Sequence, residues 1–228
     1  MRSIARIASS IAAKDLRVEW RSRVVTNQVL PFAALVMVLF AFALDDDGIT
    51  ERVAPGLVWL AVLFSLVILV TRSYAIETAD GALDQLRSSG VDPVGIFLGK
   101  AVALAVQLLV LEAVLAGLAV VLYRASIGAE GLALFVSAAL LATLGLAAVG
   151  TLYGGLAAGV RGRETLLPLL VLPVLAPVLI AATRCTESAF GLEGVDVSDG
   201  WPWLGLLAIF AVLFSVFGAF AYGPLIDE

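Results

Sequence analysis

The sequence predicts an all-α integral membrane protein with about six transmembrane helices, preceded by an N-terminal amphipathic helix at the membrane interface. Hydrophobic residues make up 61% of the 228 residues, and charged residues only 14%. Ordinary soluble domains have about 25% charged residues, and a single soluble core could not bury so much apolar surface. Several apolar runs also reach the roughly 20 residues that a helix needs to cross a bilayer. A soluble helical protein is therefore excluded.

Residues 1–23 form the predicted interfacial helix. At helical spacing one face carries Ile4, Ile7, Ala8, Ile11 and Val18, and the opposite face carries Arg2, Arg6 and Arg17. Such a helix lies in the interface with its basic face toward anionic headgroups. The alternative is a positive flank that only orients the first span. The segment has no apolar run or cleavage site typical of a signal peptide, so we expect the first apolar run to remain as an anchor.

The predicted spans follow one another without a soluble domain, so residues 1–228 form a single transmembrane domain. They cover about 27–44, 54–75, 100–123, 131–158, 165–183 and 203–222. The third span continues a helix that starts outside the bilayer, with Asp92 as its N-cap and Pro93 as its first residue.

Lysine and arginine predict that both termini are cytoplasmic, in a multi-pass protein of the plasma (inner) membrane. With that orientation eleven of them lie inside: six before the first span, Arg72, Arg87 and Lys100 after the second, and Arg161 and Arg163 after the fourth. Only Arg52, Arg124 and Arg184 lie outside. The bias alternates correctly at every loop. The net charge of −5 does not oppose it, because the rule counts only lysine and arginine.

The composition argues against most kinds of metal-binding and catalytic site. The sequence contains no histidine and one cysteine, Cys185, so it lacks the commonest metal ligand and any internal disulfide. The stretch from Val94 to Ala101 approaches a phosphate-binding loop. However, it lacks glycine at 94, Ser or Thr at 101, and a preceding strand. We therefore expect no catalytic, cofactor-binding or metal site and no nucleic-acid partner, and we interpret Lys100 as an interfacial lysine.

Residues 77–93 form the most polar inner loop and the predicted coupling segment. Ala82, Leu83 and Leu86 give a short helix an apolar stripe, flanked by Asp84, Gln85 and Arg87. A helix of this kind suits docking into a groove on a cytoplasmic partner. A solvated connector is the equally open alternative.

Two further features lie inside the predicted spans. Glu112 falls near the middle of the third span, where an ionised carboxylate costs about 2.5–3.5 kcal/mol. It should face the bundle interior or be protonated. A hydrogen-bonded structural acid is the favoured interpretation, and a proton relay or substrate contact is the alternative.

In the fourth span, small residues one turn apart predict close helix packing, with an interface to a second copy as a further option. These residues are Gly150, Gly154, Gly155 and Gly159.

Four stretches give the chain a resemblance to the CcmB family, haem exporter protein B. They are Glu51 to Gly56 with Trp59, Asp80 to Leu86, Gly99-Lys100, and Leu172 to Pro177. The family usually has Glu where this chain has Asp84, which bears on partner contact and not on fold. The resemblance implies an ABC-2-type permease-like fold and the role of permease subunit in the cytochrome c maturation ABC transporter.

The resemblance also implies a set of partners in a complex that is expected to hold two copies of the chain. A cytoplasmic ATPase subunit uses ATP. A haem-handling membrane subunit, a small accessory membrane subunit and a haem chaperone handle haem. The ATPase-coupling residues would be Asp80, Gly81, Leu83, Asp84, Gln85, Leu86 and Arg87.

Three other functions remain as alternatives. The first is an ABC-2-type exporter permease with another substrate, and the second is a passive scaffold. The third, a secondary transporter or channel, is disfavoured because such proteins usually show inverted repeats and several intramembrane polar residues.

Overall fold

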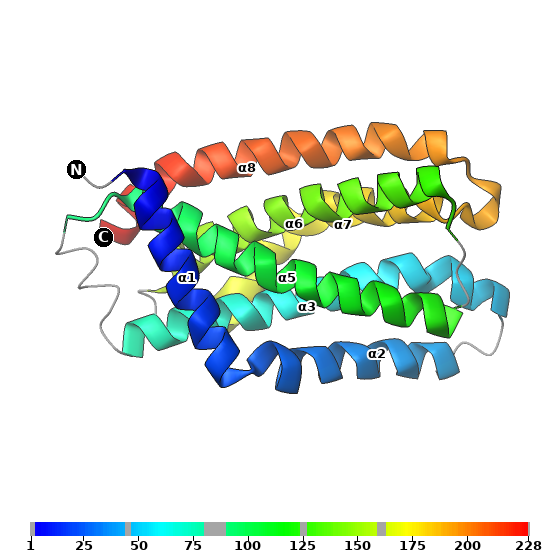
Figure 1. The fold of residues 1–228 in the computed structure, drawn as a ribbon, viewed down its shortest axis with the longest axis horizontal. Helices are drawn as coiled ribbons and strands as arrows, with labels where there is room; N and C mark the ends of the chain where they lie inside the picture. The colour runs from blue at the N-terminus through cyan, green and yellow to red at the C-terminus, as the bar shows by residue number, and fades with distance from the viewer. Residues whose placement is uncertain (1–2, 44–46, 80–89, 124–126, 159–162, 228) are drawn as a thin grey trace.

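The computed structural model describes residues 3–43, 47–79, 90–123, 127–158 and 163–227. All regular structure within these ranges is helical. In order along the chain the elements are α1 (Ile4–Ser22), η1 (Val25–Val29), α2 (Leu30–Ala43), α3 (Asp47–Ala79), α5 (Pro93–Tyr123), α6 (Ala129–Ala158), α7 (Arg163–Ala189), η2 (Leu192–Gly194), η3 (Val197–Gly200) and α8 (Trp201–Asp227). The long helices run along one axis, and α1 crosses α5 obliquely (Figure 1).

The helices confirm the prediction of about six membrane spans. Five of them, α3, α5, α6, α7 and α8, are long and apolar enough to cross a bilayer on their own. The sixth candidate pairs α1 with the helix from Val25 to Phe40, across a bend of 51°. The five residues of η1 and the fourteen of α2 reach roughly 28 Å at about 1.5 Å per residue. This nearly matches a hydrocarbon core of about 30 Å, so we assign η1 and α2 together as one further span, which is the first along the chain.

The bend between α1 and η1 has a defined structural cause. Arg23 adopts a left-handed backbone with a φ of 51°, and its N–H donates to the Glu19 carbonyl oxygen at 2.7 Å. A residue in this conformation commonly ends a helix. The Glu19 carboxylate then accepts a hydrogen bond from the Val25 N–H at 2.6 Å. These bonds stabilise the turn from α1 into the first span.

Helix boundaries agree with the sequence prediction at one point and depart from it at another. The Val94 N–H donates to the Asp92 carboxylate at 2.9 Å, which confirms Asp92 as the cap and Pro93 as the first residue of α5. The second span was expected to start near residue 54, whereas α3 begins at Asp47 and continues through Pro55. The apolar pattern marks only the membrane-buried part of a helix, so it misses the polar turns at either end.

Both chain termini lie at the same end of the bundle, which we call the terminal end (Figure 1). Helices α3, α6 and α8 finish there, and α5 and α7 begin there. The opposite end carries η2, η3 and the start of α8. The helices flanking residues 80–89 and 159–162 therefore meet at the end that holds the termini, as the predicted alternation of loops requires.

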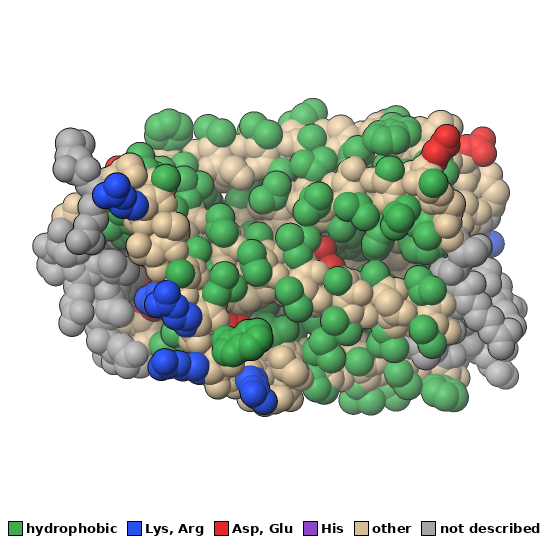
Figure 2. All heavy atoms as spheres, viewed as in Figure 1, with side chains coloured by type: hydrophobic (Ala, Val, Ile, Leu, Met, Phe, Trp, Pro, Cys, Tyr) green, Lys and Arg blue, Asp and Glu red, His purple; other side chains and the backbone are tan. Residues whose placement is uncertain are grey.

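Basic side chains are also distributed unevenly between the two ends of the bundle. Figure 2 shows basic side chains at the terminal end, over α1, and a mostly apolar surface along the length of the bundle. Most described lysines and arginines belong to the terminal end: Arg6, Lys14, Arg17, Arg21, Arg23, Arg72 and Lys100. Arg52 and Arg184 lie toward the opposite end. This distribution follows the pattern that the positive-inside rule counts.

The main core draws side chains from all six spans. Five completely buried ones illustrate it: Met37, Leu66, Leu108, Leu146 and Leu175. Leu207 of α8 joins them and is 1% exposed. Helix α8 packs along α6. At the terminal end a smaller apolar cluster joins α1, α5, α6 and α8. This second cluster lies beside the candidate site.

Candidate functional site

Four charged side chains gather under α1 at the terminal end. We call Lys14 and Asp15 of α1, Glu77 of α3 and Lys100 of α5 the charge cluster. Lys100 Nζ lies 2.7 Å from Glu77 Oε2 and 3.5 Å from Asp15 Oδ2. Lys14 Nζ lies 2.6 Å from Glu77 Oε1 and 3.0 Å from Asp15 Oδ1. The cluster thus links α1, α3 and α5 through ion pairs.

Burial makes these ion pairs different from surface pairs. The side chain of Lys100 is 3% exposed and that of Glu77 5%, whereas Lys14 is 46% exposed. Burial alone would lower the pKa of Lys14, but its hydrogen bond to Glu77 and the nearby carboxylates raise that pKa above its usual value. A buried ion that loses its partner is strongly destabilising, so the members of the cluster depend on one another.

Tyr74 of α3 extends the charge cluster into the bundle. Lys100 Nζ lies 4.6 Å from the centre of the Tyr74 ring, within range of a cation–π interaction. The Tyr74 hydroxyl donates to the Thr151 carbonyl oxygen of α6 at 2.8 Å and lies 3.0 Å from the Tyr222 hydroxyl of α8. Five helices are therefore joined by polar contacts at this end of the protein.

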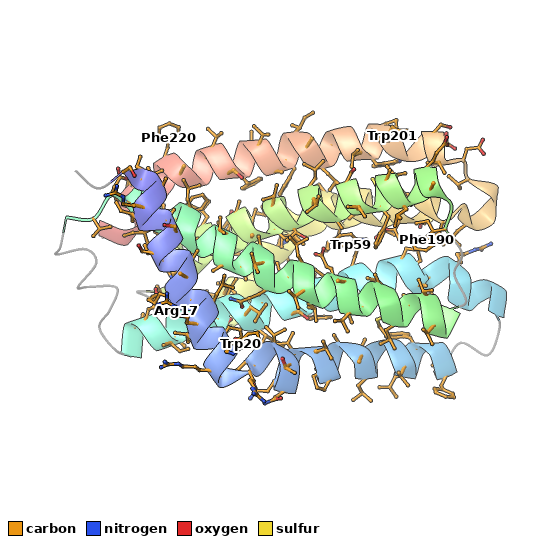
Figure 3. All side chains as sticks on the ribbon, viewed as in Figure 1. Arg17, Trp20, Trp59, Phe190, Trp201 and Phe220 are labelled. Carbon is orange, nitrogen blue, oxygen red and sulfur yellow. The ribbon has the colours of Figure 1, made fainter. Side chains whose placement is uncertain are left out.

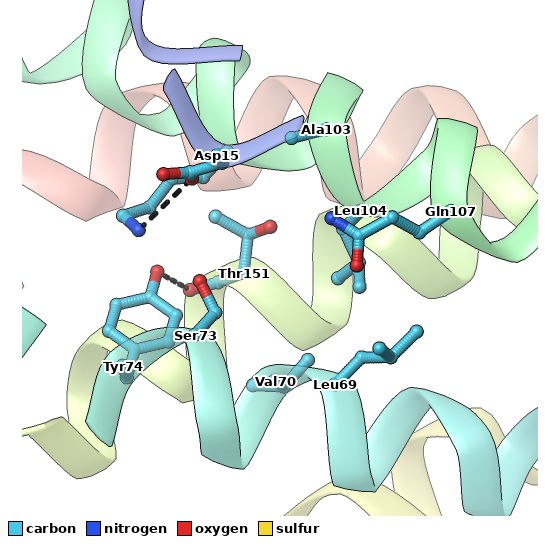
Figure 4. Close-up of a pocket in the computed structure, with 10 residues that line it drawn as sticks. Asp15, Leu69, Val70, Ser73, Tyr74, Ala103, Leu104, Gln107 and Thr151 are labelled. Carbon is cyan, nitrogen blue, oxygen red and sulfur yellow. Dashed lines mark hydrogen bonds and ion pairs between the residues drawn. The ribbon is translucent and has the colours of Figure 1, made fainter. Parts of the chain in front are cut away.

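A small polar cavity lies beside the charge cluster (Figure 4). Its volume is about 20 Å³, and Asp15, Ser73, Tyr74 and Gln107 contribute polar groups to its lining. A cavity of this size has room for about one water molecule. Figure 4 shows Asp15 approaching from α1, across from Ser73 and Tyr74 on α3.

Two glycines of α5 allow α1 to approach closely. A Cβ atom at Gly95 would lie 2.7 Å from Ile7 Cγ2, and one at Gly99 would lie 2.7 Å from both the Ala8 carbonyl oxygen and Ile11 Cβ. The predicted apolar stripe of α1 thus contacts α5 through Ile7, Ala8 and Ile11. Arg17 and Trp20 project from α1 away from the bundle (Figure 3). The placement of this outer face in the membrane interface stays a prediction.

The predicted coupling residues lie outside the described residues. They are Asp80, Gly81, Leu83, Asp84, Gln85, Leu86 and Arg87. The structure does describe both flanks of the coupling segment. Glu77 stands three positions before Asp80, and α5 begins at Pro93. The charge cluster therefore ties together the two helices between which the coupling segment runs.

Three of the four predicted packing glycines contact helices of the same chain. A Cβ atom at Gly150 would meet Leu66 at 2.9 Å, and one at Gly154 would meet Val70 at 2.7 Å and also the Tyr74 ring. At Gly155 the neighbour is the Tyr222 ring at 2.7 Å. Gly159 lies outside the described residues. The space that Gly150, Gly154 and Gly155 leave open is thus filled by α3 and α8.

Glu112 lies among buried side chains between α5 and α6. It is 6% exposed, and the Thr143 hydroxyl donates to its Oε1 at 2.7 Å. Among the described residues no group forms a hydrogen bond with its second oxygen, Oε2. The charge cluster and Glu112 are therefore two separate polar sites. The first lies at the terminal end, and the second lies within the membrane spans.

Sequence reasoning missed the charge cluster. Lys100 was expected to be an interfacial lysine, whereas α1 covers it and the described carboxylates of Glu77 and Asp15 pair with it. A signal was present in Gly95 and Gly99, which are spaced four apart and indicate close helix packing. Nothing in the sequence identified α1 as the partner helix. Across the described ranges, no group of three or more histidine, cysteine or acidic residues is placed to hold a metal ion.

Comparison with known proteins identifies the family. The family model described as CcmB protein matches residues 6–226. Heme exporter protein B of Haemophilus influenzae is 31% identical over 94% of this chain and 92% of its own length. The protein of the same name from Paracoccus denitrificans is 29% identical over 93% and 96%. A third, from Pseudomonas aeruginosa, is 26% identical over 94% and 95%.

Proposed function

Because the chain belongs to the CcmB family, we propose that it is the non-catalytic permease subunit of an ABC transporter complex for cytochrome c biogenesis. In this role it links ATP hydrolysis by a cytoplasmic ATPase subunit to the export of haem or to the release of a haem-loaded chaperone. The name of its relatives, heme exporter protein B, supports haem as the cargo of the complex. The other subunits would be a haem-handling membrane protein and a small accessory membrane protein.

The charge cluster is the observation that carries this proposal. The coupling segment runs from Glu77, at the end of α3, to the start of α5. Glu77 and Lys100 hold these two helices together, and Asp15 and Lys14 join α1 to both. Buried ion pairs fix the relative positions of the helices that they join, so a displacement of the coupling segment would be transmitted to α1, α3 and α5 together.

The side of the membrane follows from the same proposal. An ATPase subunit lies in the cytoplasm, so the terminal end must face it. The basic side chains at this end agree with that orientation. The exposed basic and aromatic side chains of α1 then lie at the cytoplasmic headgroups, where they complement anionic lipid.

The experiment is co-purification of the ATPase subunit with this chain from cells that express the whole complex. Leu83 and Leu86 supply the apolar stripe of the coupling segment, and apolar anchors carry most of the energy of a small interface. We expect Leu83→Asp or Leu86→Asp to abolish co-purification while the chain still inserts into the membrane. Charge reversal at Asp84 should weaken coupling less, because exposed charges chiefly set register.

Ser88→Asp with Ser89→Asp is the matched control, because it adds two carboxylates to the same segment outside the apolar stripe. This control should retain the ATPase subunit. Full ATPase binding and normal cytochrome c maturation in a Leu83→Asp, Leu86→Asp double variant would contradict the proposal.

A further inference from the structure

A second cavity lies within the spans, away from the charge cluster. Its volume is about 200 Å³, and it is bounded by α3, α5 and α6. The lining is almost entirely apolar and includes Val62, Leu109 and Phe135, with the Trp59 ring on α3 and the Glu112 carboxyl on α5. Figure 3 shows Trp59 pointing into the bundle interior. One acidic group therefore faces an otherwise apolar space.

The cavity opens sideways on the bundle. Val136 and Leu140 of α6 line it, and they are 47% and 46% exposed. Both residues lie within a candidate membrane-spanning helix, so on the single chain the opening lies at the depth of the bilayer hydrocarbon. Figure 2 shows acidic atoms near the middle of the bundle, surrounded by apolar side chains. A molecule dissolved in the bilayer could enter without crossing either membrane surface.

The hydrogen bonds of Glu112 leave one position open. Its Oε1 accepts from Thr143, and among the described residues nothing bonds to its Oε2, which is shielded from solvent. Buried polar atoms in proteins are nearly always hydrogen-bonded, so an unpartnered one on a residue that lines a cavity indicates an absent partner. At this depth an ionised carboxylate is costly, and no described cation pairs with Glu112, so the protonated form is favoured; it offers one hydroxyl and one carbonyl oxygen. A hydroxyl group can pair with either oxygen, because it both donates and accepts.

The size and the lining of the cavity indicate what the apolar part of the ligand is. An apolar cavity of about 150 Å³ accommodates a benzene ring, so about 200 Å³ has room for a substituted ring. Trp59 and Phe135 supply aromatic faces and edges against which such a ring packs favourably. The Trp59 Nε1–H already donates to Thr186 at 2.9 Å, so Glu112 is the group left to bind the polar end.

We propose that this cavity binds an apolar, membrane-dissolved aromatic alcohol or phenol, and that Glu112 holds its hydroxyl group. The site is formed by α3, α5 and α6 of one chain and does not depend on the coupling segment. Binding there would connect α5 and α6 through the ligand, at the depth where Thr143 already connects them.

Quenching of Trp59 fluorescence tests the proposal directly. A variant with Trp20, Trp201 and Trp203 changed to Phe leaves Trp59 as the only tryptophan. The probes are 4-bromophenol and bromobenzene, which share the heavy atom that quenches and differ by the hydroxyl group. At equal concentration in the membrane phase, we expect 4-bromophenol to quench saturably. Its half-saturating concentration should be about five- to tenfold lower than that of bromobenzene, because one hydrogen bond strengthens binding by about this factor.

Three variants separate binding in the cavity from general partition into lipid. Glu112→Leu should remove the preference for the phenol. Ala139→Leu, which fills the cavity from α6, should abolish saturable quenching by both probes, whereas Ala176→Leu, at an exposed position of α7 that does not line the cavity, should leave it unchanged. Equal half-saturation of the two probes in the Trp59 protein would overturn the proposal, as would unchanged binding in Ala139→Leu. If Glu112→Leu fails to fold, the comparison of the two probes and the Ala139→Leu result still test the proposal.

Discussion

At the scale of single residues, the structure contains two kinds of ion pair that should differ in energy. Lys100 and Glu77 are almost completely buried and lie 2.7 Å apart. Arg184 and Glu187 lie 2.8 Å apart, but the Arg184 side chain is 56% exposed. Removing one partner of a buried pair leaves an uncompensated charge, whereas an exposed pair is screened by solvent.

We therefore expect Lys100→Met to lower the free energy of unfolding by about 3 kcal/mol, because Glu77 and Asp15 lose their buried cation. Arg184→Met is the control, and its effect should stay below about 1 kcal/mol. The measurement is reversible unfolding of the purified protein in mixed detergent micelles. Equal effects of the two substitutions would show that the charge cluster does not hold the helices together.

At the scale of elements, α1 is docked on α5 by close backbone approach. Gly95 and Gly99 leave the space that Ile7 and Ile11 fill. Gly117 lies on the same helix α5 with nothing near the position of a Cβ atom. Side chains added at these glycines should therefore have opposite consequences for α1.

We expect Gly99→Leu to detach α1 from the bundle, whereas Gly117→Leu should not. Ala12 of α1 is 7% exposed and reports on the contact. In a Cys185→Ser background, a cysteine at position 12 should react slowly with a thiol reagent. Gly99→Leu should raise the labelling rate several-fold. An unchanged rate in Gly99→Leu would show that α1 does not need the close approach.

The elements also show how far the sequence predicts this structure. Apolar runs predicted each span, because lipid demands a long apolar segment wherever the chain crosses. The amphipathic pattern predicted α1, and proline after aspartate predicted the start of α5 at Pro93. The charge cluster was not predictable in this way, because Asp15, Glu77 and Lys100 are far apart in sequence. Their meeting depends on the 51° bend at Arg23 and on the crossing of α1 over α5.

At the scale of the whole molecule, the common position of both termini leads to a topology that can be tested in intact cells. Single cysteines at Ser3, Ser198 and Asp227, each with Cys185→Ser, can be exposed to a thiol reagent that does not cross membranes. Ser198 belongs to η3 at the opposite end from the termini. Only the cysteine at position 198 should react, because the proposed orientation puts the terminal end in the cytoplasm. Labelling at position 3 or 227 in unbroken cells would reverse the assignment.

The contact with an ATPase subunit is the centre of the functional account, and site-specific photocrosslinking measures it most directly. A photoreactive amino acid would replace Leu83 in the coupling segment, and in a separate variant Ser198 at the opposite end. After illumination of cells that contain the whole complex, the account predicts a crosslink to the ATPase subunit from position 83 and none from position 198. A crosslink to the ATPase from position 198, or its absence from position 83 in an assembled complex, would contradict the account.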